Sequence, residues 1–363
     1  MKIFIVCNNL GIGGAERVAV NLANGFVGKG HKVYIVTDLL NQKASYSVDN
    51  KVSIMALCRK SNSKKKWFGA PFRLRTFLKK EKPDIIIGFM HVCSIISRLA
   101  TVGLKVPVIM TIHHSLESKE YHLDFLTRWL DKHTTRMYKA VTVLNQADKA
   151  YLGQRHKNIV VMPNPLTFSP VNEVPPKQKI ILAAGRISNW YYKGFDLLLE
   201  AWGKIANSYP DWILKIAGDG PKENFDYLEN IAKHCKIDNR VEFLGYQMNM
   251  ISLYRESSIF ALSSRSEGLP MVLIEAMSQG CAPVACENLG RTREIIQDCN
   301  QGILYKTGDV TSMSEALGKM IRDDEYRHYV QKNAVKRSTF YRSENILNMW
   351  ELLLTNLINT KGV

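Results

Sequence analysis

Short runs of β-branched and aliphatic residues alternate with stretches of helix length, and this alternation occurs twice along the chain. In the first half the runs lie at 2–7, 32–37, 52–57, 84–89, 107–112, 140–144 and 158–163. In the second half they lie at 179–185, 212–218, 241–245, 258–264 and 282–286. Several runs are continuously apolar, as is typical of parallel strands covered on both faces. The pattern therefore predicts an α/β protein with two doubly wound, Rossmann-like domains.

The segment VMPNPLTFSP at 161–170 holds three prolines among turn residues and marks the expected domain boundary. We expect a first domain over 1–165, a second over 166–342 and a separate amphipathic helix within 343–363. Ligands of open parallel sheets bind beyond the carboxyl ends of the strands. Two such domains facing each other would place a ligand in the cleft between them.

Net charge differs sharply between the two halves. Residues 1–170 carry 26 Lys and Arg against 10 Asp and Glu, whereas 171–363 carry 23 against 23. Such asymmetry favours an anionic partner for the first half: a membrane surface, a lipid phosphate or nucleic acid. A basic face that only keeps the protein soluble is the alternative. No run reaches about 18 apolar residues, so no membrane span is expected.

Seven scattered cysteines, without a C-x-x-C pair, indicate reduced thiols in a cytoplasmic protein and argue against a zinc site.

The loop LGIGGAER at 10–17 follows the first run and opens a helix, where free N–H groups favour an anion. Gly11 and Gly13 fit the dinucleotide fingerprint G-x-G-x-x-G, but Glu16 occupies the third glycine's place. Asp38, at the end of the second run, keeps an NAD-dependent oxidoreductase open as an alternative. The extra Gly14 better suits a backbone that turns tightly under a bulky phosphate or sugar.

Three further strand ends carry polar or glycine residues. TIHHS (111–115) presents His113 and His114 to opposite sides, although a lone strand-end histidine is more often an ordinary polar residue. AAGRISNWYYKGF (183–195) presents Arg186 and Lys193 before a helix that begins near Gly194. Two cations there suit a diphosphate, although solvated loop charges are the alternative. AGDGP (217–221) allows a ligand to approach the backbone closely.

Two glutamates flank an apolar run in SRSEGLPMVLIEAMSQG (264–280). An unpaired buried carboxylate costs several kcal/mol, so each glutamate needs a partner. Pro270 stands where a first helical residue is favoured and Gly280 where a helix ends. Glu267 would then lie beside a helix N-terminus that can hold phosphate, and Glu275, inside the helix, could accept two ribose hydroxyls. A structural salt bridge of Glu275 is the alternative.

These segments, in this order, resemble the retaining glycosyltransferases of family 4, which have the GT-B fold. The resemblance runs from GGAERV through TIH, PNP, AAGR…KGFDLLLEA, IAGDGP and VEFLG to SRSEGLP…IEAM. It implies that Glu275 binds the ribose and that Glu267 and His113 contact the donor sugar. Arg186 and Lys193 would hold the diphosphate. The predicted donor-binding residues are Gly13, Gly14, Gly185, Gly218, Gly245, Gly268, Leu269, Pro270 and Glu275. The helix within 343–363 would pack back on the first domain.

The resemblance also implies retention of anomeric configuration and no need for a metal or a cofactor beyond the nucleotide-sugar substrate, with UDP as its carrier. Arg186, Lys193 and the helix dipole would stabilise the departing diphosphate. One departure matters: the interval between Arg186 and Lys193 is two residues longer than usual, with Trp190–Tyr192 inside it. Lys193 is therefore the weakest of these assignments.

The acceptor should bind the basic first half. KSNSKKKWFGAPFRLRTFLKK (60–80) interleaves cations with aromatic residues, as an interfacial segment does. A surface helix packed on its sheet is the alternative. The residues assigned here are Lys64, Lys65, Lys66, Trp67, Phe68, Arg73 and Arg75. We expect a polyprenyl-diphosphate-linked glycan acceptor at the inner face of a bacterial plasma membrane and no nucleic acid. A UDP-sugar epimerase on the same fold is the other alternative.

Overall fold

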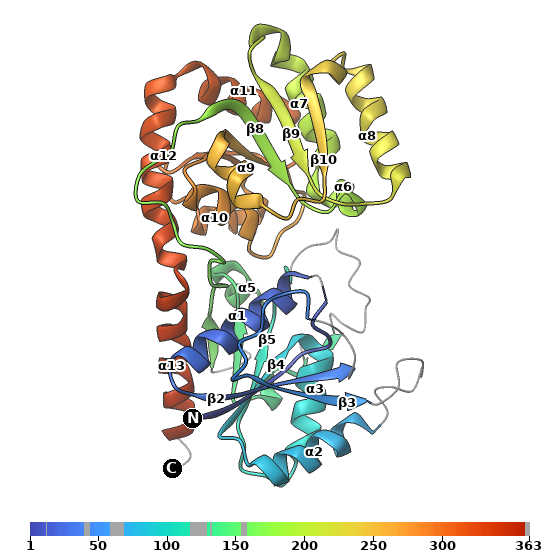
Figure 1. The fold of residues 1–363 in the computed structure, drawn as a ribbon, viewed down its shortest axis with the longest axis vertical. Helices are drawn as coiled ribbons and strands as arrows, with labels where there is room; N and C mark the ends of the chain where they lie inside the picture. Colours follow the sequence, from blue (N-terminus) through green and yellow to red (C-terminus); the bar gives the residue numbers. More distant parts are fainter. Residues whose placement is uncertain are drawn as a thin grey trace. The chain divides into compact units, whose positions relative to one another are not determined.

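The computed structural model describes residues 1–11, 13–39, 44–58, 69–116, 129–130, 133–153 and 158–359. The chain forms two compact units (Figure 1). The first contains the described residues up to Pro165 together with the segment that begins at Ser343. The second contains Leu166–Arg342. Among the described residues, no helix combines the length and the apolar character needed to cross a bilayer.

The first unit is built on a seven-stranded parallel sheet with strand order β3-β2-β1-β4-β5-β6-β7. Its strands are β1 (Lys2–Val6), β2 (Lys32–Leu39), β3 (Ser53–Cys58), β4 (Ile85–Phe89), β5 (Val108–Thr111), β6 (Ala140–Val143) and β7 (Ile159–Val161). Its helices are α1 (Gly14–Gly28), α2 (Ala70–Glu81), α3 (Met90–Ala100), α5 (Gln146–Leu152) and α13 (Ser343–Asn359). The reversal of strand order beside β1 is the topology of a doubly wound sheet.

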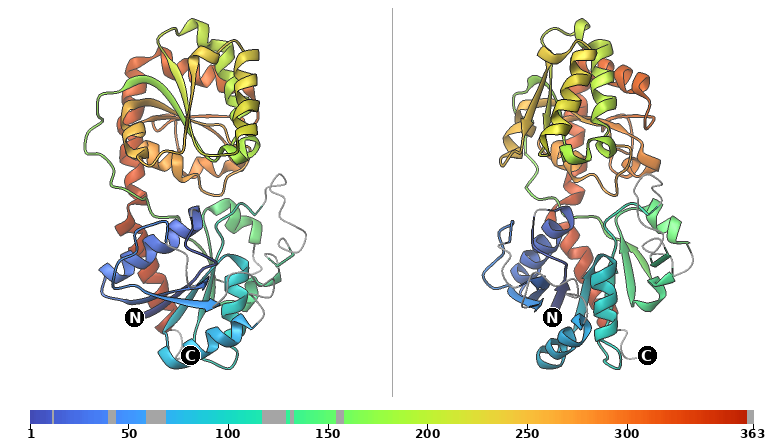
Figure 2. Two further views of the ribbon diagram at one scale, coloured as in Figure 1. Left: turned by 45° about the vertical axis from the view of Figure 1, so that its right-hand side comes forward. Right: turned by 90° about the vertical axis from the view of Figure 1, so that its right-hand side faces the viewer.

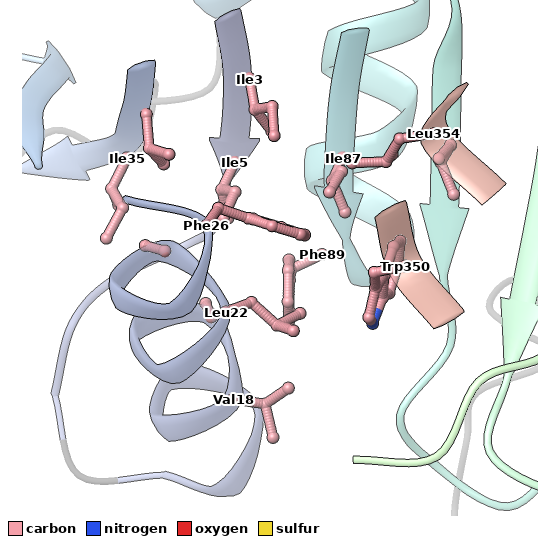
Figure 3. Packing of buried hydrophobic residues seen from close by; sticks show 14 of the residues in the cluster. Ile3, Ile5, Val18, Leu22, Phe26, Ile35, Ile87, Phe89, Trp350 and Leu354 are labelled. Atoms are coloured by element: carbon pink, nitrogen blue, oxygen red, sulfur yellow. The ribbon is translucent and has the colours of Figure 1, made fainter. Parts of the chain in front are cut away.

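Side chains of the central strands alternate between two apolar layers. Ile3 and Ile5 of β1 face a core shared with α1 and α13, whereas Phe4 and Val6 face a core shared with α2 and α3. The helix α13 contributes Trp350 and Leu354, which Figure 3 shows beside β4. Both side chains are almost fully buried, so the last helix is part of the first unit's core.

The second unit has a six-stranded parallel sheet with strand order β10-β9-β8-β11-β12-β13. Its strands are β8 (Gln178–Ala184), β9 (Ile213–Ala217), β10 (Val241–Gly245), β11 (Ser257–Leu262), β12 (Ala282–Cys286) and β13 (Ile303–Tyr305). Its helices are α6 (Trp190–Lys193), α7 (Phe195–Ile205), α8 (Lys222–His234), α9 (Met250–Glu256), α10 (Met271–Ser278), α11 (Val310–Arg322) and α12 (Asp324–Ser338). Helices cover both faces of this sheet (Figure 2).

The predicted fold class is confirmed: both units are parallel α/β sheets of the doubly wound type. Each expected strand is present within one or two residues of its predicted ends. The sequence reading missed β13, because three residues are too few to show a periodic pattern. It also began α10 one residue early, since Pro270 is the cap that precedes the helix and Met271 is its first residue.

Candidate functional site

Three of the predicted glycines lie at the carboxyl ends of adjacent strands of the second unit. Gly185 follows β8, Gly218 follows β9 and Gly245 ends β10. The Gly185 N–H donates to Ala217 O, and the Gly218 N–H donates to Gly245 O, both at 2.9 Å. A Cβ on Gly218 would overlap the carbonyl of Gly185. Glycine is therefore required at position 218 for these strand ends to pack together.

Glu267 lies in the loop between β11 and α10, at the same end of the sheet. Its carboxylate accepts a hydrogen bond from Ser264 Oγ at 2.7 Å, and Lys193 Nζ lies 2.7 Å from the same oxygen. The Glu267 side chain is only 12% exposed, so these contacts replace most of its hydration. The charged partner of Glu267 is thus Lys193, which lies 74 residues earlier in the chain.

The lengthened interval between Arg186 and Lys193 folds into the short helix α6. Lys193 is its last residue, and Gly194 then turns the chain with a φ of 65°. The Lys193 side chain passes over Gly185, where a Cβ would lie 3.1 Å from Cγ and Cδ of the lysine. The small Gly185 thus gives the lysine a path to Glu267.

Arg265 joins this inserted turn to the β11–α10 loop. Its guanidinium makes a bidentate pair with Asp196 at 2.7 and 2.8 Å and lies over the Tyr191 ring at 4.2 Å. Its backbone N–H donates to Tyr192 O at 2.8 Å. Paired planar groups of this kind resist rotation. The two loops that carry Lys193 and Glu267 are consequently fixed to each other.

Glu275 is buried inside α10, and both carboxylate oxygens accept hydrogen bonds from hydroxyls. Tyr254 OH donates to Oε2 at 3.2 Å, and Thr167 Oγ1 donates to Oε1 at 3.1 Å. Tyr254 is fully buried, whereas Thr167 is exposed. A carboxylate has about four lone-pair positions, so such a group can accept several hydroxyl donors at once. Of these two hydroxyls, only that of Thr167 belongs to an exposed residue.

The remaining predicted residues of this unit surround the start of α10 and the end of β8. Leu269 and Pro270 are buried beside the first turn of α10, and Gly268 is partly exposed. The first N–H groups of a helix have no intrahelical partner and carry a partial positive charge. Arg186 is exposed, just before a helical turn at Ile187–Asn189. This end of the sheet therefore combines cationic and N–H donors with two carboxylates.

His113 and His114 lie in the first unit, after β5, and have different neighbours. The His113 ring stacks on Phe89, with centroids 4.8 Å apart and planes 8° apart, and its Nε2 lies 3.0 Å from Thr111 Oγ1. The His114 ring lies 5.4 Å from that of His91. Burial lowers the pKa of His113 to about 4, against a smaller opposing effect of a hydrogen bond with Asn164. His113 is therefore a neutral imidazole near pH 7.

Gly13 and Gly14 begin α1, with Gly13 as its cap in an extended conformation. The Tyr46 hydroxyl lies 3.1 Å from Gly13 N and 3.0 Å from Gly13 O. A Cβ on Gly13 would overlap the Glu16 carboxylate, which lies beside the helix start. This carboxylate already provides the negative charge that the helix dipole favours. A dinucleotide fingerprint would place a pyrophosphate at this helix start, and the Glu16 carboxylate argues against one there.

Part of the basic segment is described. Lys64, Lys65, Lys66, Trp67 and Phe68 lie outside the described residues. Arg73 is exposed on α2. Arg75 donates to the carbonyls of Ala100 and Val102 at 2.9 and 2.6 Å, so it joins α2 to the end of α3. Phe72, which precedes the exposed cations Arg73, Lys79 and Lys80 of α2, is 76% exposed.

The structure brings together the predicted residues of the second unit, whereas His113, Gly13 and Gly14 belong to the first. The sequence reading missed Ser264, Arg265 and Asn288, which hold the Glu267 loop. Ser264 and Arg265 lie in the same motif as Glu267, SRSEGLPMVLIEAMSQG at 264–280, and this closeness in sequence is the feature from which their contacts could be predicted. Within the described ranges, no three His, Cys, Asp or Glu side chains gather as metal ligands would.

Two family models match successive parts of the chain. One, described as Glycosyltransferase Family 4, matches 12–168, and the other, Glycosyl transferases group 1, matches 167–337. An uncharacterized glycosyltransferase of Haemophilus influenzae is 32% identical over 97% of this chain and 99% of its own.

Two further relatives have more specific names. A Campylobacter jejuni enzyme is 28% identical over 99% of both chains, and it is named as an α-1,4-N-acetylgalactosaminyltransferase acting on a diphospho-undecaprenol-linked glycan. An Escherichia coli enzyme is 28% identical over 72% of both chains, and its name gives UDP-Gal as donor and a diphosphoundecaprenol-linked N-acetylglucosamine as acceptor. Among solved structures, sucrose-phosphate synthase of Thermosynechococcus elongatus superimposes with a TM-score of 0.84, at 17% identity over 99% of both chains.

Proposed function

Because this chain belongs to the glycosyltransferases, with the GT-B arrangement of two Rossmann-like domains, we propose that it transfers a hexose or N-acetylhexosamine from a UDP-sugar to a lipid-linked glycan. The observation that carries the proposal is the pair of carboxylates on either side of the α10 start. Glu267, in the loop before α10, is paired with Lys193. Glu275, inside α10, accepts a hydrogen bond from the exposed Thr167, and we propose that a ligand hydroxyl replaces this bond.

In this proposal the donor lies along the carboxyl ends of β8 to β11. Glu275 accepts ribose hydroxyls in place of Thr167, and the diphosphate meets the first N–H groups of α10, with Arg186 beside it. Lys193 has three N–H donors, so it can keep Glu267 and also reach a phosphate oxygen. Gly245, where a Cβ would meet nothing within 4 Å, leaves room for the ligand at the end of β10.

Glycosyl transfer requires a diphosphate to leave as the anomeric carbon becomes cationic. Arg186, Lys193 and the helix dipole oppose the growing negative charge, a preorganised effect of a few kcal/mol per donor group. No metal is needed where these cations suffice. We propose same-face attack with retention, in which a phosphate oxygen takes the proton of the acceptor hydroxyl. Glu267 binds sugar hydroxyls and is not a nucleophile, because a glycosidase-type pair needs both carboxylates at the scissile bond.

In this proposal the first unit supplies the acceptor side, and His113 and the Gly13–Gly14 turn are its contribution to the reaction. Relatives named for diphosphoundecaprenol-linked acceptors support a polyprenyl-diphosphate glycan as acceptor. The neutral His113 would donate or accept a hydrogen bond without adding charge. The relatives described above are named as transferases, and none supports the epimerase alternative.

We further propose that α2 contacts the inner face of the plasma membrane. Phe72 is exposed among the cations Arg73, Lys79 and Lys80, and the first half of the chain carries the whole net charge of +16. Basic surfaces with exposed aromatic residues bind anionic lipid. Cosedimentation with phosphatidylglycerol vesicles at low salt tests this, with phosphatidylcholine vesicles as control and Phe72→Ser as the weakened variant. Equal binding to both lipids would contradict the proposal.

The donor site is tested by thermal shift with UDP, GDP and NAD at matched concentrations. A ligand present at 100 times its dissociation constant stabilises the folded protein by about 2.7 kcal/mol. A shift with UDP alone supports the proposed donor. A shift with GDP alone keeps the reaction and changes the carrier. A shift with NAD alone would contradict the site assigned to Glu267 and Glu275.

A further inference from the structure

The turn after β12 has an unusual backbone. Asn288, Leu289 and Gly290 adopt successive left-handed conformations, with φ of 45°, 53° and 83°. For a residue such as leucine this conformation is unfavourable, whereas glycine tolerates it and asparagine adopts it more readily than most. Such strain persists where the surroundings fix it and is common at functional sites.

Backbone hydrogen bonds hold the turn in this conformation. Asn288 N donates to Thr307 Oγ1 at 2.8 Å, and Gly290 N donates to Glu287 O at 3.0 Å. Arg291 N donates to Asn288 O at 3.1 Å. These bonds fix the backbone of the turn, so other interactions of the folded protein must compensate for its strain.

What the turn provides is the placement of the Asn288 side chain. The residue is 2% exposed, and its amide bonds both polar backbone groups of one residue, Glu267. Glu267 N donates to Asn288 Oδ1 at 3.2 Å, and Asn288 Nδ2 donates to Glu267 O at 3.1 Å. Only a side-chain amide offers an acceptor and a donor side by side. Two bonds to one peptide segment fix the direction in which the Glu267 side chain leaves the backbone.

Glu267 is therefore held from three directions. Asn288, after β12, fixes its backbone, whereas Lys193, before α7, and Ser264, within its own loop, fix its carboxylate. The proposed function assigns nucleotide binding to Glu275 and to the start of α10, which follow the Glu267 loop in the chain. The Asn288 bonds to Glu267 are therefore separate from the groups assigned to the nucleotide. The constraint acts on the one carboxylate that the proposed function assigns to the sugar.

We propose that Asn288 is a positioning residue for recognition of the donor sugar, acting through Glu267. This inference rests on the proposed function, since it concerns the sugar half of the donor site. It predicts that loss of the amide weakens binding of the sugar moiety and leaves binding of the nucleotide moiety unchanged.

Two variants separate the amide from the strain. Asn288→Gly removes the side chain and accepts the left-handed backbone without penalty. Leu289→Gly relieves strain at the adjacent residue of the same turn and keeps the amide. Dissociation constants are measured by calorimetry for UDP, UDP-glucose, UDP-galactose, UDP-N-acetylglucosamine and UDP-N-acetylgalactosamine. If the wild type binds only guanine nucleotides, GDP and GDP-mannose replace them. Hydrogen exchange of the Glu267 amide is followed without ligand.

For Asn288→Gly we expect the ratio of the UDP-sugar to the UDP dissociation constant to rise about tenfold, because a hydrogen bond to a charged group is worth about 1.5 kcal/mol or more. The Glu267 amide should exchange faster in the same variant. Leu289→Gly should leave the ratio and the exchange as in the wild type.

An unchanged ratio in Asn288→Gly would overturn the inference, and so would an equal loss of UDP and UDP-sugar affinity, which would mark a general structural role. Failure of the wild type to bind any of these nucleotides would overturn the proposed function itself and, with it, the role in sugar recognition. Because that result is seen in the wild type and not in the variant, the two failures are distinguishable.

Discussion

Lys193 Nζ lies 2.7 Å from Glu267 Oε1, so a residue placed by an inserted helical turn neutralises the carboxylate of the β11–α10 loop. Both side chains are mostly buried, with 24% and 12% exposed. Forming a buried ion pair adds little to the free energy of unfolding, because both charges lose their hydration. Removing one partner is strongly destabilising, because the other charge stays buried without a partner.

Lys193→Met should therefore lower the free energy of unfolding by about 1–3 kcal/mol, since the Glu267 carboxylate loses its charged partner. The double variant Lys193→Met/Glu267→Gln should recover at least half of this loss. Urea unfolding measures both. The control is Lys179→Met, which breaks an exposed pair with Asp211 and should cause no measurable change. A double variant no more stable than the single one would contradict the coupling.

Glu275→Gln should weaken UDP binding by about tenfold or more, because charged acceptors make the stronger hydrogen bonds to hydroxyls. Thr167→Val should leave UDP affinity unchanged, since the ligand replaces the Thr167 bond. Tyr254→Phe removes a buried bond and should cost about 1 kcal/mol of stability. Calorimetric titration and urea unfolding of the three variants check these outcomes. Retained UDP affinity in Glu275→Gln would remove Glu275 from the donor site.

Gly194 and Gly245 have nearly equal φ, 65° and 63°, but different surroundings. A Cβ at Gly194 would overlap the Ser263 carbonyl, whereas a Cβ at Gly245 would meet nothing within 4 Å. Gly245→Ala should cost only the left-handed backbone penalty, about 1–2 kcal/mol. Gly194→Ala should cost clearly more and should displace Lys193. Thermal unfolding compares the two, and equal losses would show that the overlap is relieved without strain.

His113 has a pKa of about 4 in the folded protein, below the ordinary value of 6.5. The unfolded chain then binds the proton more tightly, so this residue's stabilising effect is complete above pH 6.5 and is lost as pH falls toward 4. His113→Phe keeps a ring against Phe89 and removes the titration. The wild type should lose more stability than this variant between pH 7 and pH 4.5 in urea unfolding. Parallel pH profiles would contradict the assignment.

Much of the fold could be predicted from local pattern. Apolar runs such as 84–89 predict buried parallel strands, and β4 lies within that run. The amphipathic run at 343–359 coincides with α13. The short edge strand β13 could not be found this way, because its pairing with β12 defines it and its composition does not.

The candidate site was predictable only in its motif residues. Glu267, Glu275 and the strand-end glycines stand in recognisable positions, and their roles stay predictions. The partners of Glu267 could not be found from the sequence, because Lys193 and Asn288 come from other strand ends of the sheet. The charge of Lys193 predicts a phosphate contact, which stays a prediction, whereas the structure bonds the lysine to Glu267. The inserted residues Trp190–Tyr192, which weakened that assignment, form the helix that presents the lysine.

The place of α13 in the first unit has a consequence for synthesis. Trp350, Leu354 and other residues of α13 complete a core whose remaining members lie before residue 165, so ribosomal translation must pass about 190 further codons before that core can close. At about 5–20 residues per second this takes roughly 10–40 s, during which the ribosome synthesises the second unit, Leu166–Arg342. The unit whose synthesis starts first is therefore the one whose core is completed last, and until then its apolar surface stays exposed to contacts with other chains.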